Sequence, residues 1–348
     1  MSANDNGTRT TNLALQGGGA HGAFTWGALD ALLEDERIEF DGVCGASAGA
    51  MNAVVLAHGL LEGGREGARA ALAAFWGDIG KSGVLWNAVR PSADVLSFFG
   101  VDPRMAAAGT HALFETWARL LSPYQFNPWN FDPLRRLLER HVDFGALGRD
   151  GCLKLFICAT NVRSGKVRIF DNSELGSDAV LASACLPQLF KAVEIEGEAY
   201  WDGGYMGNPA LYPLFYHVNS RDIVVVHVNP IRREDVPRTP EDIAVRINEI
   251  TFNSSLMREM RAIEFAARLV EQGWLKDEYA HRIKRMLVHS IRDDAGMATL
   301  GMASKLSPDR KLLDTLFASG RATALAWLQA HFADLGVRDS VDVRAEFL

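Results

Sequence analysis

The residues of this chain best suited to chemistry form the pentapeptide Gly45-Ala46-Ser47-Ala48-Gly49. The pentapeptide follows a short apolar run, Val43-Cys44, and precedes small and apolar residues from Ala50 to Leu61 that suit a helix. A Gly-x-Ser-x-Gly sequence between a strand and a helix is the layout of a nucleophile elbow, in which the serine occupies a strained turn. The free N–H groups at the start of the helix would then favour a negative charge beside Ser47.

A glycine-rich stretch upstream suits the binding of such a charge. Residues Thr11 to Gln16 read as a buried strand, and Gly17-Gly18-Gly19-Ala20-His21-Gly22 follows at once. Residues Ala23 to Leu33 have helical spacing, with a stripe of candidate core residues at Phe24, Leu29, Leu32 and Leu33. A glycine run between a strand and a helix presents backbone N–H groups to an anion.

A single carboxylate stands between apolar residues and glycines further along the chain. The segment is Tyr200-Trp201-Asp202-Gly203-Gly204, in which the two glycines allow another backbone to approach closely. A serine is a weak nucleophile and needs a base against its proton. Asp202 is a candidate for that base.

The three blocks, in this order, resemble the patatin-like phospholipase family. Two further segments resemble it as well, Asn127-Pro128 through Leu134 and Ala182 through Pro187, and the resemblance covers about residues 13–230. It implies a lipid acyl hydrolase of the phospholipase A or lysophospholipase type, acting through an acyl-serine intermediate without a cofactor. The family usually has arginine or lysine at the position of His21.

The resemblance also implies a role for each block. Ser47 and Asp202 would form a Ser–Asp dyad, and the backbone N–H groups of Gly18, Gly19 and Ala48 would form the oxyanion hole. Supporting positions would be Gly17, His21, Gly22, Gly45, Gly49, Gly203 and Gly204. Two readings of His21 stay open: a direct role beside the oxyanion, or packing at the start of a helix. The scattered histidines show no metal-ligand spacing, so we expect no metal site.

The order of the apolar runs predicts an α/β fold. Strands are expected at Leu153 to Thr160, Val167 to Phe170, Val193 to Trp201 and Asp222 to Asn229, with helical runs between strands. With the resemblance, this predicts a three-layer α/β/α fold with a mainly parallel central sheet and a helical C-terminal extension.

The predicted organisation is a hydrolase core over residues 11–230 followed by a helical region over residues 231–348. Within the core, residues 71–131 are rich in aromatic residues and are broken by glycine and proline. This segment, which includes Phe98 and Phe99, is either a lid and acyl-chain pocket or a second packing layer.

Composition limits the partners. The chain has 348 residues and a net charge of −7, with 48% hydrophobic and 23% charged residues. This indicates a globular protein and argues against a nucleic-acid partner. We expect no secretory signal, no spanning helix, and free thiols at the four cysteines. The expected location is the cytoplasm, with lipid or acyl-ester substrate met in solution or peripherally at the inner membrane surface; the sequence does not indicate an oligomeric state.

Three alternatives compete with the hydrolase reading. The pattern Gly17-x-Gly19-x-x-Gly22, with Asp41 about 20 residues on, also fits a dinucleotide-binding protein. An α/β-hydrolase with a Ser–Asp–His triad requires several strands before Ser47, where the sequence offers one or two. A non-catalytic interaction protein would keep the same fold without the activity.

Overall fold

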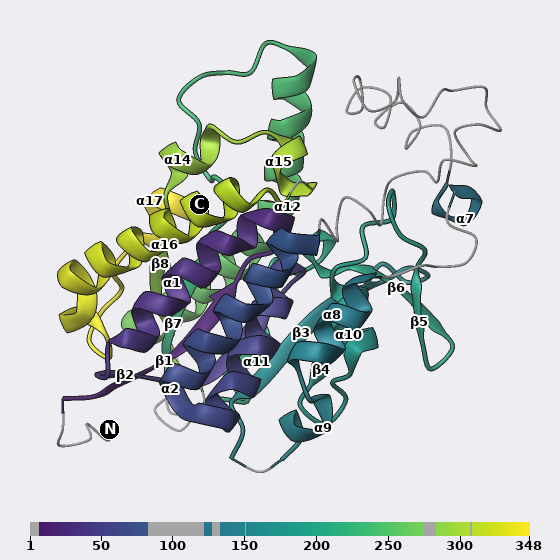
Figure 1. Ribbon diagram of the computed structural model, residues 1–348. Coiled ribbons are helices and arrows are strands. Elements are labelled where there is room, and N and C mark those ends of the chain that lie inside the picture. The colour runs from purple at the N-terminus through teal and green to yellow at the C-terminus, as the bar shows by residue number, and fades with distance from the viewer. Residues whose placement is uncertain (1–6, 83–121, 127–132, 150, 275–282, 307) are drawn as a thin grey trace.

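A mixed, mainly parallel sheet lies at the centre of the computed structural model, which describes residues 7–82, 122–126, 133–149, 151–274, 283–306 and 308–348 (Figure 1). The strand order is β5-β6-β3-β2-β1-β7-β8, with β4 paired to β3. β3 pairs with β4 and β6, and β5 with β6, in antiparallel fashion, and the other pairs are parallel. The strands are β1 (Arg9–Leu15), β2 (Ile38–Gly45), β3 (Lys154–Asn161), β4 (Val167–Asp171), β5 (Val193–Ile195), β6 (Glu198–Asp202), β7 (Asp222–Val226) and β8 (Leu287–Ile291).

Alternation along the central strands sends side chains to two separate cores. Leu13 and Leu15 of β1 pack in one cluster of buried residues, whereas Ala14 between them packs in another. In β7, Val224 and Val226 join the first cluster, while the neighbouring isoleucine and valine join the second. Because successive side chains of a strand point to opposite faces, each face of the sheet needs its own layer of helices.

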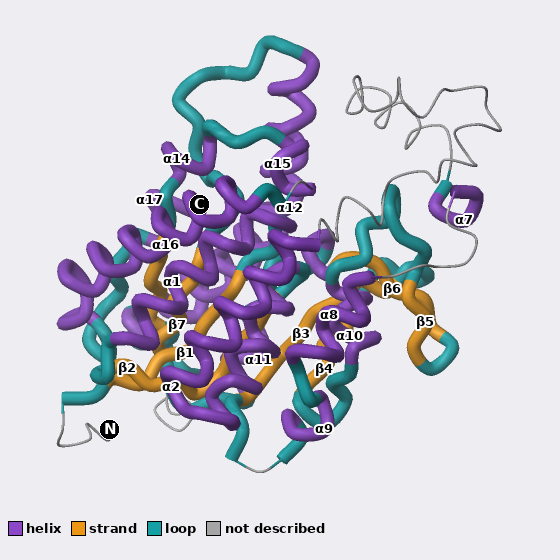
Figure 2. Tube along the Cα trace, viewed as in Figure 1, coloured by secondary structure: helices purple, strands orange, loops and turns teal. Residues whose placement is uncertain are grey.

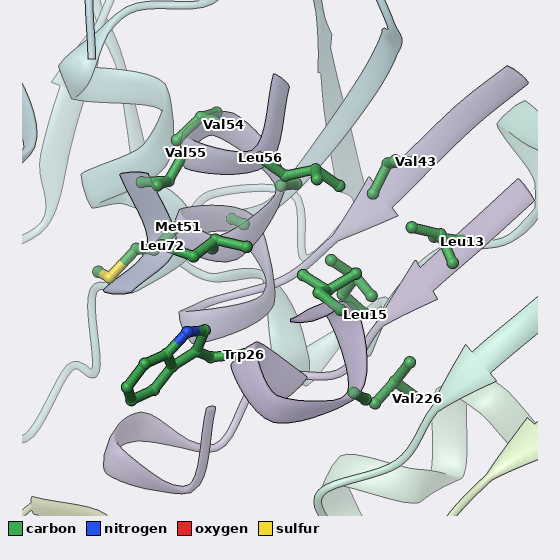
Figure 3. Close-up of a cluster of buried hydrophobic side chains, with 14 of the residues drawn as sticks. Leu13, Leu15, Trp26, Val43, Met51, Val54, Val55, Leu56, Leu72 and Val226 are labelled. Carbon is green, nitrogen blue, oxygen red and sulfur yellow. The ribbon is translucent and has the colours of Figure 1, made fainter. Parts of the chain in front are cut away.

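The first layer consists of α1 (Gly22–Glu34), α2 (Ala48–Ser82) and α16 (Arg310–His331) (Figure 2). Figure 3 shows Leu13, Leu15 and Val226 of the strands in one cluster with Leu56 of α2 and Trp26 of α1. Helices α1 and α16 cross closely, since a Cβ on Gly27 would stand 2.0 Å from the carbonyl oxygen of Phe317. The path of α2 breaks at Gly63 and Gly64, whose backbone angles are not helical.

The second layer consists of α11 (Tyr212–Tyr216), α12 (Pro240–Glu271) and α17 (Val343–Phe347). The side chain of Thr239 accepts a hydrogen bond from the backbone N–H of Asp242 and so caps α12. Shorter elements complete the described chain: η1 (Gly19–His21), α7 (Pro123–Phe126), α8 (Pro133–His141), α9 (Phe144–Leu147), α10 (Ser177–Ser183), η2 (Gly203–Tyr205), α14 (Asp294–Ala298), α15 (Met302–Leu306) and η3 (Phe332–Asp334).

The structure confirms the predicted fold class, including the C-terminal helices, and corrects two details. The run from Val193 to Trp201 is a hairpin rather than one strand, because Glu196 and Gly197 both have positive φ and turn the chain between β5 and β6. The region after residue 230 is also not purely helical. Its residues 287–291 form β8, which pairs with β7 in the central sheet.

Most of the aromatic-rich segment lies outside the described residues, Phe98 and Phe99 included, so both expectations for it, a lid and acyl-chain pocket or a second packing layer, stay predictions. All four cysteines are free, and Cys152 is the one that is only partly buried. In the part of the chain that the structure describes, no helix combines the length and the apolar character needed to cross a membrane.

Candidate active site

The register of β3 brings the Ser47 turn and Asp202 to the same edge of the sheet. Ile157 of β3 pairs with Gly45 at the end of β2, and Ala159, two residues further on, pairs with Asp202 at the end of β6. Because β4 occupies the other side of β3 over the same residues, β6 continues on the side of β2. Asp202 therefore lies just beyond the carboxyl end of β2, where the chain turns through Ser47.

Ser47 occupies a strained turn between β2 and α2. Its φ is 52°, a left-handed value that is uncommon for a residue with a side chain. The turn is held by the backbone N–H of Ser47, which donates to Oγ of Ser183 at 2.9 Å. Ala48 begins α2, so its N–H has no partner within the helix. This is the geometry that the pentapeptide predicts.

The glycine-rich loop passes directly against this turn. A Cβ on Gly17 would stand 2.6 Å from the Cβ of Ser47, so only glycine fits there. The backbone N–H of Gly17 donates to Oδ1 of Asn208 at 2.7 Å, which fixes the loop. Gly19 has φ +59° and begins η1, with Gly18 as the preceding cap residue. The first N–H groups of a helix lack partners within it. That those of Gly18 and Gly19 bind an oxyanion stays a prediction.

Asp202 is fully buried and only half satisfied. Its Oδ1 accepts a hydrogen bond from the N–H of Gly204 at 2.7 Å. Its Oδ2 makes no hydrogen bond of normal length among the described residues, although the Ser47 side chain lies near enough to lower the pKa of the carboxyl. Burial raises the pKa of Asp202 to about 7, and the Gly204 N–H, the Ser47 side chain and the Lys305 ammonium act against that rise. A carboxyl with a pKa near neutrality is a better general base than an exposed one.

The remaining glycines of the motifs allow close packing around Ser47 and Asp202. A Cβ on any of these six glycines, named below, would stand 2.1–2.8 Å from a neighbouring atom. Gly203 would meet the carbonyl oxygen of Cys158, and Gly204 the ring of Phe252. The others that the sequence analysis singled out are Gly18, Gly22, Gly45 and Gly49.

His21 is buried, and its contacts are those of a residue that packs at the start of a helix. Its Nε2 and Oγ of Ser304 in α15 are hydrogen-bonded at 2.8 Å. Burial, helped by the charge of Lys305, lowers the pKa of His21 to about 3, so the ring is neutral at pH 7. His21 therefore does not supply a cation to the oxyanion loop, and the structure favours the reading in which it packs at the start of a helix.

Several residues at this site escaped the sequence analysis. Lys305 of α15 lines the same pocket as Ser47 and Gly19, although about a hundred residues separate it from Asp202 and nothing in the local sequence marks it. Asn229 donates from Nδ2 to the carbonyl oxygen of Gly17 at 2.8 Å. It follows the strongest strand of the chain, so its place at the carboxyl edge was a usable signal.

The pocket beside Ser47 is lined by apolar side chains. They come from α2, from α8 and from the segment between α10 and β5, and they comprise Ala48, Met51, Phe75, Trp76, Ile79, Leu134, Ala184, Leu186, Leu189 and Phe190, with Leu306 of α15. Such a lining suits an acyl chain, because each buried CH₂ contributes about 0.8 kcal/mol.

The geometry does not favour the dinucleotide alternative. Asp41 lies inside β2, four residues before the strand ends, rather than at the carboxyl edge where a ribose would bind. Its carboxylate accepts hydrogen bonds from Nζ of Lys154 and from the backbone N–H of Ser220, both at 2.9 Å. Among the described residues, no group of three acidic, histidine or cysteine side chains is placed to hold a metal ion.

Comparisons with known proteins give a structural neighbour and a family match. The chain is similar to the solved structure of VipD from Legionella pneumophila, with a TM-score of 0.44 and 16% sequence identity, over 92% of this chain and 67% of that one. It matches no curated protein sequence. The model of the patatin-like phospholipase family matches residues 13–215, which hold the serine turn, the glycine-rich loop and the buried aspartate. The chain therefore belongs to the patatin-like phospholipase family.

Proposed function

We propose that this protein hydrolyses carboxylic esters of lipids through an acyl-serine intermediate, with Ser47 as the nucleophile and Asp202 as the general base. One observation carries the proposal. Ser47 stands in a strained turn at the start of a helix, and its side chain lies close enough to the buried Asp202 carboxyl to lower the pKa of that group. Family membership supports the class of reaction, because patatin-like phospholipases are lipid acyl hydrolases.

In the first half of the reaction, Oγ of Ser47 attacks the carbonyl carbon of the ester. The hydroxyl proton passes to Asp202, for which Oδ2 is the available acceptor. A bond forms between Oγ and the carbonyl carbon, and the carbonyl π electrons move onto oxygen to give the oxyanion. When this intermediate collapses, the ester C–O bond breaks, and the leaving alkoxide takes the proton back from Asp202.

In the second half, a water molecule replaces the alcohol. Asp202 takes a proton from the water as it attacks the acyl-serine, a second oxyanion forms, and its collapse releases the fatty acid and returns the proton to Ser47. The N–H groups of Gly18, Gly19 and Ala48 are the candidates for stabilising both oxyanions. Removing one such donor typically costs about 2.7–4 kcal/mol of barrier.

The proposal is tested by replacing each member of the pair. Ser47→Ala and Asp202→Asn should each lower kcat on lipid esters by about 10³-fold or more, and the double variant should be no worse than either, because the two groups act as one unit. Hydrolysis of mono- and diacyl lipids is followed by mass spectrometry, and hydrolysis of p-nitrophenyl butyrate by absorbance.

Ser164→Ala is a suitable control, because Ser164 is exposed in the turn between β3 and β4. This variant should keep full activity. Near-normal turnover of the Asp202→Asn protein would rule out the dyad, and a purified protein without any Ser47-dependent hydrolysis would favour the non-catalytic alternative.

A further inference from the structure

Lys305 places a positive charge in the lining of the pocket beside Ser47. It lies on α15, 90 residues after the end of the family match, and lines the pocket together with Ser47 and Gly19. Apart from Ser47, the other described side chains in this lining are apolar. An ammonium group in such surroundings is costly to keep unless it has a charge to balance.

The lysine is fixed to the glycine-rich loop at two points. Its Nζ donates to Oδ1 of Asn229 at 2.8 Å and to Oδ1 of Asn248 at 3.0 Å. The amide of Asn229 in turn donates to the carbonyl oxygen of Gly17, so one asparagine joins the ammonium to the loop. The backbone of Lys305 also touches the loop, because its carbonyl oxygen would stand 2.3 Å from a Cβ on Gly19.

The charged groups around Lys305 show which negative charge it balances. Glu249 of α12 already has two guanidinium partners, Arg233 at 2.6 Å and Arg246 at 3.1 Å. His21 of η1 is neutral at pH 7, as described above. Asp202 is the remaining carboxylate whose charge acts on Lys305. Burial lowers the pKa of Lys305 to about 8, while Glu249 and Asp202 oppose this and Arg233 adds to it.

We propose that Lys305 is a positioning residue of this reaction, whose ammonium balances the one negative charge that moves from Asp202 to the oxyanion. The inference rests on the proposed function. Before attack, the pocket holds a carboxylate and an ammonium. After attack, Asp202 carries the serine proton and the oxyanion carries the charge, so the net charge of the pocket is unchanged. The loop that would bind the oxyanion is also the one to which Lys305 is tied.

The test compares Lys305→Met and Lys305→Arg with Lys154→Met as a matched control. Lys154 is also partly exposed and pairs with Asp41 at 2.9 Å. It is the first residue of β3, so it lies at the end of the strand away from Ser47 and Asp202. The substrate is p-nitrophenyl butyrate, which is neutral and short, so that headgroup or chain binding does not contribute. Rates are measured from about pH 5 to 9, together with the melting temperature of each variant.

We expect kcat of Lys305→Met to fall about tenfold or more with KM little changed. The acid limb of kcat/KM, which should lie near pH 7 in the unmodified protein because the Asp202 carboxylate is the active form, should move to higher pH when the cation is lost. Lys305→Arg should restore most of the rate, and Lys154→Met should leave both rate and limb in place.

Three results would overturn the inference: an unchanged acid limb in Lys305→Met, an equal loss in Lys154→Met, or no rescue by arginine in a folded protein. A second measurement does not depend on activity. The free energy of unfolding is measured against pH for four proteins: the unmodified protein, Asp202→Asn, Lys305→Met and the double variant. The effect of Asp202→Asn in the two lysine backgrounds reports how Lys305 affects the titration of Asp202. If Ser47→Ala kept full hydrolysis, the proposed function would fail, while this cycle would still decide whether the two charges are coupled.

Discussion

At the scale of single residues, the buried carboxyl of Asp202 is the group that the proposed mechanism makes reactive, and its burial also costs stability. The protein holds this group away from water, with one oxygen bonded to Gly204 and the other without a hydrogen bond of normal length among the described residues. Burial raises its pKa from the ordinary 3.8 to about 7. The folded state therefore binds this proton more tightly than the unfolded state does.

This difference predicts how stability depends on pH. The contribution of Asp202 to the free energy of unfolding is fully favourable below about pH 4. It is lost as the pH rises through about 7, because the carboxyl ionises at lower pH in the unfolded state than in the folded state. Asp202→Asn removes the ionisation. At pH 8 the variant should be more stable than the unmodified protein by an amount on the order of 1–4 kcal/mol, and at pH 4 the two should be equal. Urea unfolding at both pH values measures this.

Asp235→Asn provides the comparison, because Asp235 is exposed in the loop before α12. It should leave the unfolding free energy within about 0.5 kcal/mol at both pH values. Equal stability of the Asp202→Asn and unmodified proteins at pH 8 would mean that the buried carboxyl carries no such cost.

At the scale of elements, the site depends on the contact between η1 and α15. Gly19 begins η1 with a positive φ, and the carbonyl oxygen of Lys305 in α15 fills the space where its side chain would be. His21 adds a hydrogen bond to Ser304 across the same contact. A displacement of α15 would therefore move both the candidate oxyanion donors and the lysine.

Gly19→Ala should reveal this dependence. The new methyl group would meet the Lys305 carbonyl oxygen at 2.3 Å, so loop and helix must separate. We expect kcat to fall by about 100-fold or more, as for the loss of an oxyanion donor, and stability to fall by more than about 1 kcal/mol. The two measurements are initial rates of ester hydrolysis and urea unfolding.

Gly165→Ala is matched for backbone strain. Gly165 also has a positive φ, +66°, but a Cβ there would meet nothing within 4 Å. The Gly165→Ala variant should lose about 1 kcal/mol of unfolding free energy from backbone strain alone and keep its activity. A similar loss of activity in both variants would show that strain, rather than the contact with α15, is responsible.

At the scale of the whole molecule, the region after residue 230 belongs to the same packed structure as the family-matching part. It contributes β8 to the sheet and α16 to the layer over α1. Gly27 and Gly320 bring those two helices together, since a Cβ on either would stand 2.0 Å from a carbonyl oxygen of the other helix. The division at residue 230 that the sequence suggested does not separate two cores.

We therefore predict that a chain ending at residue 230 will not fold. The truncation would expose the edge of β7 and the face of α1 that α16 covers, and it would remove Lys305 from the pocket. The fraction of soluble protein and its circular dichroism spectrum, compared with those of the full chain, measure the effect. Cooperative unfolding together with Ser47-dependent hydrolysis in the shortened chain would instead support an independent core over residues 11–230.

The sequence by itself determined the fold class, several of the strands and the three motif blocks. Ser47 and the glycines around it were recognisable because a strained turn permits few residue types, and this restriction is written in adjacent positions. The strands at Thr11 to Gln16 and Asp222 to Asn229 were predictable because each contains an apolar run, Leu13 to Leu15 and Ile223 to Val226, as buried strands do. The hairpin at Glu196-Gly197 and the strand β8 were missed, because a short apolar run does not reveal its pairing partner.

Only the tertiary structure decided the electrostatics of the site. The neutral state of His21 follows from its burial against α15, and the raised pKa of Asp202 follows from its burial beside Ser47. The cation of the pocket is Lys305, which reaches it from a helix about a hundred residues after Asp202. Local sequence fixes which groups a segment carries, whereas desolvation and charge pairing depend on every segment that packs around those groups.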